Sequence, residues 1–158
     1  MAKQNIPLRP LQDQVDAITP IVCYVTDGDG QTITEYTDTT VDFTQVSVDT
    51  AGSWDTTNNQ YECPVDGLYQ ISCAVNFSAA ISGDIQLRIT KDGAAIGQVV
   101  RLDVGANMST MLPAVIADCS SGDILKTQVY FREGSDTGDT KTLSTSAARC
   151  YMSIVKIN

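Results

Sequence analysis

The 158-residue chain contains no histidine, although histidine is the side chain that enzymes most often use as a general base near neutral pH. Its absence excludes the Ser-His-Asp and Cys-His arrangements of hydrolases and the zinc motifs that need histidine ligands. Glycine-rich phosphate-binding motifs and the GxSxG motif are also missing. Two carboxylates alone can hydrolyse a glycosidic bond, but no pair stands out among the nineteen acidic residues. The sequence therefore predicts a protein without enzymatic activity.

One acidic stretch could bind a cation. Hard cations such as calcium need several oxygen ligands at once, and residues 27–30 (Asp-Gly-Asp-Gly) offer two carboxylates, with Glu35 and Asp38 nearby in the sequence. The stretch does not match an EF-hand loop, because a glutamine and a threonine follow where an acidic residue and a glycine are required. Aspartate and glycine also favour turns, so a plain turn between strands is the favoured interpretation. A calcium site at Asp27 and Asp29 is the alternative, and we expect no other cofactor.

The net charge of −9 is unevenly distributed along the chain. No lysine or arginine occurs between Pro10 and Leu87, whereas twelve acidic residues do, and the rest of the chain is close to neutral. Nucleic acids and anionic membranes are bound through clustered lysine and arginine side chains. We therefore expect neither a nucleic acid nor a membrane as a partner.

Five cysteines are widely spaced and form no CxxC pair: Cys23, Cys63, Cys73, Cys119 and Cys150. Small secreted domains usually carry an even and dense set of cysteines. We therefore interpret these residues as buried thiols that act as small hydrophobic side chains, in preference to a disulfide framework. Neither a secretory signal nor a transit peptide is visible in residues 1–10, so we expect that the chain is either cytosolic when made or has lost a leader, and the buried thiols fit folding in a cytosol.

The sequence divides into two parts, a short N-terminal segment and one domain. Residues 1–20 contain three prolines. The apolar side chains between the second and the third have helical spacing: Leu11, Val15 and Ile18. A helix of about eight residues is not stable alone in water. We therefore expect an arm over residues 1–20, extended or as a short helix, that anchors on another surface. Residues 21–158 then form one domain.

From residue 21 onward the hydrophobic pattern has a period of two. Apolar and polar side chains alternate over residues 67–77 and again over residues 85–89, which precede a Lys-Asp-Gly turn and a strand beginning near Ile96. Alternation is typical of half-buried strands, and the turn is typical of a hairpin. Further strands are expected at residues 21–26, 41–48, 60–63, 111–117, 124–131 and 148–157. Eight or more strands with almost no helix predict an all-β, two-sheet sandwich.

Four motifs follow one another in an informative order. They are residues 43–46 (Phe-Thr-Gln-Val), Trp54-Asp55 with residues 61–69, the turn within residues 87–93, and residues 121–125 (Ser-Gly-Asp-Ile-Leu). The second includes a Pro-x-x-Gly-Leu-Tyr run, and the fourth a Gly-Asp pair. In this order they resemble the C1q and tumour necrosis factor-like (C1q/TNF-like) jelly-roll superfamily, especially C1q-like globular heads. The resemblance covers about residues 21–158 and implies a two-sheet jelly roll.

The resemblance also implies an oligomeric state. Members of this superfamily are typically homotrimers whose subunits pack through an apolar and aromatic sheet face. Carried over to this chain, the candidate interface residues are Tyr69, Tyr130, Phe131 and Tyr151. Neither a collagen repeat nor the basic patches of some complement relatives accompany the domain. In this respect the chain resembles virion proteins of bacterial viruses, which use such jelly rolls as capsid decoration proteins or fibre knobs.

Two functions follow as expectations. The favoured one is a trimeric virion surface protein, a capsid decoration or cement protein made in the host cytoplasm. Its arm, through Leu11, Val15 and Ile18, would anchor it to a capsid or other virion protein. The alternative is a C1q-like binding head or fibre knob, located outside the cell, that recognises a glycan or protein receptor.

Overall fold

The computed structural model describes residues 20–27, 29–105, 108–134, 138–146 and 149–157. These residues form thirteen strands and no helix, and so none of them belongs to a helix that could span a membrane. In chain order the strands are β1 (Val22–Thr26), β2 (Thr32–Thr34), β3 (Thr39–Thr40), β4 (Gln45–Asp49), β5 (Trp54–Asp55), β6 (Gln60–Glu62), β7 (Gly67–Asn76), β8 (Ile81–Lys91), β9 (Ala94–Val104), β10 (Ser109–Cys119), β11 (Ile124–Arg132), β12 (Thr140–Thr142) and β13 (Tyr151–Lys156). The predicted all-β class is confirmed.

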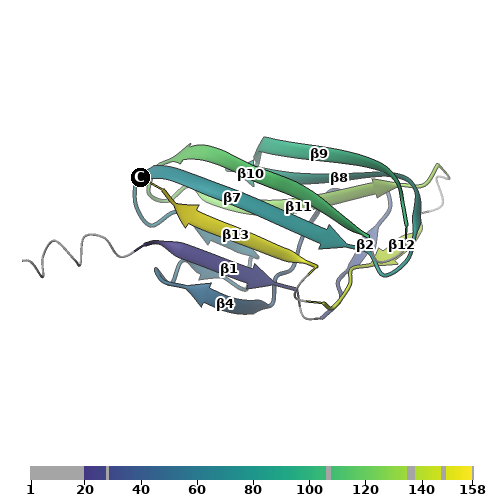
Figure 1. Ribbon diagram of the computed structural model, residues 1–158, viewed down its shortest axis with the longest axis horizontal. Coiled ribbons are helices and arrows are strands. Elements are labelled where there is room, and N and C mark those ends of the chain that lie inside the picture. Colours follow the sequence, from purple (N-terminus) through teal and green to yellow (C-terminus); the bar gives the residue numbers. More distant parts are fainter. Residues whose placement is uncertain (1–19, 28, 106–107, 135–137, 147–148, 158) are drawn as a thin grey trace, which may run out of the picture.

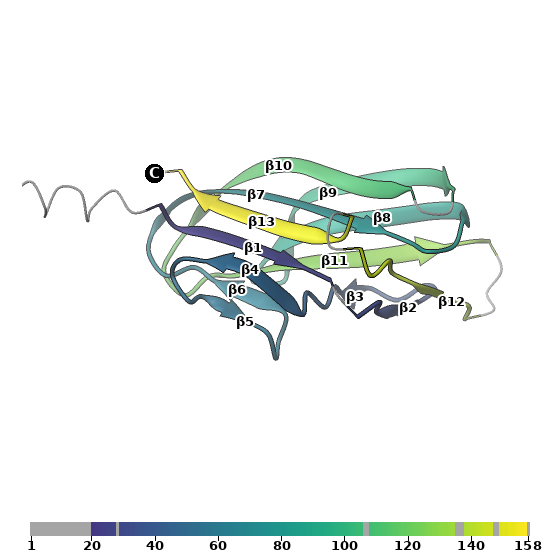
Figure 2. The ribbon, with the colours of Figure 1, turned by 60° about the horizontal axis from the view of Figure 1, so that its bottom comes forward.

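Two large antiparallel sheets face each other across the molecule (Figures 1 and 2). The five-stranded sheet has the order β10-β7-β13-β1-β4, and it lies in front in Figure 1. The six-stranded sheet has the order β5-β6-β11-β8-β9, with β3 paired to β11 beside this path. A small third sheet joins β12 to β2. Neighbours in a sheet are mostly distant in sequence, as in a jelly roll, so the predicted two-sheet sandwich is confirmed.

The strongest sequence patterns give the longest strands. In β7 the side chains of Tyr69 and Ile71 are buried and that of Gln70 is exposed, as the period of two predicts. The expected hairpin joins β8 to β9 through Asp92 and Gly93, whose φ angles are 50° and 82°. Two successive residues at positive φ form the turn that matches the twist of a two-residue hairpin, and glycine adopts this conformation without a steric penalty.

One predicted strand is wrong in its extent. The pattern of residues 41–48 predicts a single strand, but only residues 45–48 belong to one, β4, while β3 ends before this range at Thr40 and pairs with the other sheet. Val41 and Phe43 lie between these two strands and are fully buried. The chain crosses from one sheet to the other here, and its apolar side chains fill the space between the sheets. Burial at a crossover therefore produces the same apolar spacing as burial in a strand.

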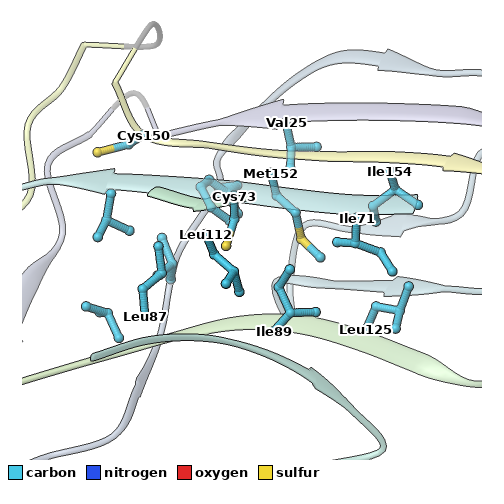
Figure 3. Packing of buried hydrophobic residues seen from close by; sticks show 14 of the residues in the cluster. Val25, Ile71, Cys73, Leu87, Ile89, Leu112, Leu125, Cys150, Met152 and Ile154 are labelled. Carbon is cyan, nitrogen blue, oxygen red and sulfur yellow. The ribbon is translucent and has the colours of Figure 1, made fainter. Parts of the chain in front are cut away.

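The hydrophobic core lies between the two sheets. Figure 3 shows Ile71, Cys73, Met152 and Ile154 from the five-stranded sheet pointing toward Leu87 and other aliphatic side chains of the six-stranded sheet. Aromatic pairs extend this packing along the sandwich, for example Phe77 with Phe131 at a centroid distance of 5.7 Å. Burial of apolar area at about 25 cal/mol per Å² is the main favourable term in folding. Both sheets depend on this one core.

All five cysteines are buried and free, which confirms their interpretation as small core side chains. Burial raises the pKa of the Cys23 and Cys73 thiols to about 12 and that of Cys150 to about 11. These three thiols therefore stay protonated at neutral pH. The predicted arm lies almost entirely outside the described residues, which include only Pro20 of it. Leu11, Val15 and Ile18 are outside them too, so their anchoring role stays a prediction.

Candidate functional site

The outer side of the five-stranded sheet carries no charge across most of its width. We call it the uncharged face and define it by the outward side chains of its strands: Val22, Tyr24, Val48, Gln70, Ser72, Ala74, Met111, Ile116, Tyr151, Ser153 and Val155. All of these positions lie in the described part of the chain, and none of them is acidic or basic. Within the five strands of this sheet, whose residues the structure describes throughout, a charged outward side chain appears only near the end of β10, at Asp118.

Aromatic and aliphatic side chains lie next to one another on the uncharged face. The rings of Tyr24 and Tyr151 stack with centroids 5.7 Å apart. Burial, with Tyr24 alongside, raises the pKa of the Tyr151 hydroxyl, so this hydroxyl is neutral at physiological pH. Met111 and Ile116 are 52% and 60% exposed. Contiguous exposed apolar surface on a soluble domain typically marks an interaction site.

The outer side of the six-stranded sheet is built differently, and we call it the charged face. Arg132 pairs with Asp84 at 2.7 Å, and Arg88 pairs with Asp38 at 2.8 Å. Asp84 is only 5% exposed, so its carboxylate depends on the guanidinium of Arg132 for compensation. Covering this face with another molecule would remove these ions from water, which costs free energy unless the partner replaces the lost hydration. The two outer faces therefore favour different environments.

The four predicted interface residues lie in three different places. The prediction is wrong for Tyr69 and Phe131, because both side chains are fully buried between the sheets and offer no surface to a partner. The Tyr69 hydroxyl donates its hydrogen bond within the chain, to the carbonyl oxygen of Val65 at 2.8 Å. Tyr130 lies on the charged face. Tyr151 lies on the uncharged face, and its interface role stays a prediction.

Several residues of the uncharged face were missed by sequence reasoning. Tyr24, Met111 and Ile116 belong to segments whose alternation predicts strands, but alternation does not reveal which of two faces turns outward. In β10 a register shift between Leu112 and Val115 further obscures the period. The absence of charge at every second position of neighbouring strands is the signal that would have located this face.

The candidate cation residues form a turn. The Asp27 side chain is 1% exposed, and its Oδ1 accepts hydrogen bonds from the backbone N–H groups of Asp29 at 2.9 Å and Gly30 at 3.1 Å. The Asp29 side chain points into solvent. No group of three or more acidic, cysteine or histidine side chains suited to a metal occurs within the residues that the structure describes. The geometry supports the turn interpretation, and calcium binding stays a prediction.

These two interpretations predict different responses to calcium. Asp27→Ala removes two hydrogen bonds to a carboxylate and should lower the free energy of unfolding by roughly 1–3 kcal/mol, equally in calcium and in chelator. Asp29→Ala is the matched control and should have little effect, because its side chain is exposed. Denaturant unfolding of both variants and the parent protein in each buffer measures this. A calcium-dependent stabilisation that disappears in both variants would show an ion site instead.

Comparisons with known proteins identify the fold. No protein-family model matches the chain, and no curated protein sequence does. Solved structures that resemble it include the globular domain of a zebrafish complement 1qA protein (TM-score 0.64, 11% identity, covering 88% of this chain and 98% of that one). Others are murine APRIL (TM-score 0.65, 12% identity, 88% and 100% covered) and the Eiger TNF of S. frugiperda (TM-score 0.64, 13% identity, 88% and 93% covered). The fold is a C1q/TNF-like jelly roll.

Proposed function

We propose that this protein is a non-enzymatic structural or binding protein that assembles as a homotrimer through its uncharged face. The C1q/TNF-like fold supports the proposal, since the superfamily that the sequence resembles typically forms trimers through an apolar and aromatic sheet face. The observation that carries it is the contrast between the two outer faces. One is uncharged across most of its width and exposes large apolar side chains, and the other carries partly exposed ion pairs.

Physical chemistry favours the uncharged face as the contact surface. Burying Met111, Ile116 and the Tyr24–Tyr151 pair removes apolar area from water. It also leaves no ion in a low-dielectric environment. The other outward residues of the face are small or carry neutral polar groups that can hydrogen-bond across an interface. Homo-oligomer interfaces are characteristically more apolar than other interfaces. The charged face would then remain in water, where its ion pairs are hydrated.

Two tyrosine pairs provide a direct test of this orientation. Tyr24 and Tyr151 lie on the uncharged face, and Tyr36 and Tyr130 form a comparable pair on the charged face, with ring centroids 6.4 Å apart. Nitration with tetranitromethane followed by peptide mass mapping should modify Tyr36 and Tyr130 and spare the first pair in the assembled protein. Nitration of all four tyrosines at equal rates at high protein concentration would contradict the proposal.

The biological role that we propose for the trimer is that of a capsid decoration or cement protein on a virion surface. Residues 1–20 would anchor it, with Leu11, Val15 and Ile18 facing the shell. Removing residues 1–20 should leave a folded trimer that no longer attaches to empty shells, whereas Gln128→Glu, a substitution on the charged face, should leave attachment unchanged. Full attachment of the shortened chain would defeat this role. The protein would be made in the host cytoplasm.

The charged face supports a second candidate, a head that binds a glycan or protein receptor. In the proposed trimer this face stays exposed, and it combines ion pairs with the Tyr36–Tyr130 pair, a composition common in recognition surfaces. Screening the intact trimer on a glycan array and on host cells would test this. Binding that is lost in Tyr130→Ala but kept in the trimer of Asp29→Ala would favour the receptor role, and absence of binding would count against it.

A further inference from the structure

Two of the buried cysteines lie side by side at one end of the sandwich. Cys63 follows β6 where the chain leaves the six-stranded sheet, and Cys119 is the last residue of β10 in the five-stranded sheet. Each thiol therefore lies where the chain crosses between the two sheets. The two thiols are close enough to interact. Beside the larger effect of burial, this interaction raises the pKa of the Cys63 thiol and lowers that of the Cys119 thiol, which itself donates a weak hydrogen bond to the Ala117 carbonyl oxygen at 3.9 Å.

The backbone holds these two crossovers together. The Cys63 N–H donates to the Asp123 carbonyl at 2.9 Å, and the Gly122 N–H donates to the Cys63 carbonyl at 2.8 Å. Side chains add to this contact, because the Ser121 hydroxyl donates to the Pro64 carbonyl at 3.1 Å. Directly across the β7–β10 ladder, Cys119 is paired with Gly67. The proximity of the two thiols is thus built into the fold and does not depend on side-chain rotamers alone.

We infer that Cys63 and Cys119 form a redox-sensitive pair that a small-molecule disulfide such as glutathione disulfide converts into an intramolecular disulfide linking the two sheets. The Cys63 thiolate attacks one sulfur of glutathione disulfide, which forms a mixed disulfide and releases one glutathione thiolate. The Cys119 thiolate then attacks the Cys63 sulfur and releases the second glutathione. Two protein thiols are oxidised and one small disulfide is reduced to two thiols, so atoms and electrons balance.

Access to the pair sets the rate of this exchange. Cys63 is among the residues around an open pocket of about 390 Å³ that also includes Trp54 and Ser121, and a small disulfide would approach the thiol from this pocket. Cys63 and Cys119 are only 0% and 2% exposed, and burial raises the pKa of both thiols. The reactive thiolate is therefore scarce in the folded protein, and exchange should be slow and accelerate as pH rises. During folding, before burial is complete, the same exchange should be fast.

The test is to refold the reduced, denatured full-length chain in an oxidising glutathione buffer. The disulfide can then reach equilibrium during folding, without the slow thiol exchange of the folded protein. Alkylation and intact-mass analysis should show that the wild-type protein and the control variant Cys73→Ala each lose two free thiols, without a glutathione adduct. Cys63→Ala and Cys119→Ala should not form the intramolecular disulfide. Reducing the bridged protein should lower its thermal midpoint by about 10 °C, because a disulfide that closes a long loop constrains the unfolded chain.

Three results would overturn the inference. The first is a wild-type protein that refolds in this buffer with all five thiols free. The second is a product that carries only glutathione adducts. The third is a disulfide that still forms when either Cys63 or Cys119 has been replaced. Should one alanine variant fail to fold, Cys63→Ser and Cys119→Ser give the same readout with smaller changes in side-chain volume.

Discussion

Gln70→Glu is expected to dissociate the trimer, raising its dissociation constant by at least about 100-fold at neutral pH. Gln70 is an exposed residue in β7, and the strand register places it between Val155 and Ile116 on the uncharged face. The substitution adds a charge and changes almost nothing in size. In a threefold assembly it buries three carboxylates at once, and a buried charge without a partner costs several kcal/mol. Sedimentation velocity over a dilution series measures the effect.

The matched control is Gln128→Glu. Gln128 lies in β11, the central strand of the six-stranded sheet, and faces outward opposite Arg88. The same isosteric change on the charged face should leave the trimer intact. Acid provides a second check: below about pH 4 the carboxyl introduced by Gln70→Glu is protonated and neutral, so the trimer should recover. Equal behaviour of the two variants would contradict the assignment of the interface.

Phe131→Ala is expected to lower the free energy of unfolding by about 3–5 kcal/mol, the largest stability change among the predictions made for this protein. The Phe131 side chain is fully buried and packs edge-to-face against Phe77, with ring centroids 5.7 Å apart. Truncation leaves a cavity between the sheets that the surrounding strands cannot fill. Urea unfolding followed by circular dichroism measures the loss.

The preceding residue provides the control. Tyr130 lies on the opposite side of the same strand, is half-buried, and contacts Tyr36. Tyr130→Ala should cost roughly 1 kcal/mol, the value of an aromatic pair at a surface. Comparable losses in the two variants would mean that β11 does not present these faces as described. If Phe131→Ala does not fold, Phe131→Leu should show a smaller loss in the same direction.

Much of the fold could be predicted because local patterns and turn chemistry agree. The alternation in β7 and the Asp92-Gly93 turn each specify an element on their own, and both were located to within a few residues. The motif order linked these elements to a C1q/TNF-like jelly roll. The prediction of a strand around Val41 and Phe43 was wrong, because a buried crossover and a buried strand produce the same apolar spacing.

The interface could be predicted only in part. Tyr69 and Phe131 were assigned to it because large aromatic side chains are common at interfaces, but the same property suits them to the core. Which side of a strand faces the partner sheet depends on pairing between segments distant in sequence, such as β13 with β1 and β7. Gln70 and Ile116, for example, become neighbours only through the β7–β10 ladder. No local pattern contains this information.

The contact between Cys63 and Cys119 was also beyond the sequence. Their separation along the chain is large, and no spacing motif connects them. Hydrogen bonds between the loops at 63–66 and 120–123 bring them together, and these depend on where both sheets end. Sequence patterns therefore do not reveal contacts between side chains that lie at two different crossovers.

Self-association through the uncharged face is the central claim, and sedimentation equilibrium tests it most directly. The chain mass is 16.9 kDa, and at micromolar concentration the protein should sediment as a single species of three times that mass. The Gln70→Glu variant should sediment as a 16.9 kDa monomer under the same conditions. A wild-type protein that remains monomeric throughout the micromolar range would contradict the account.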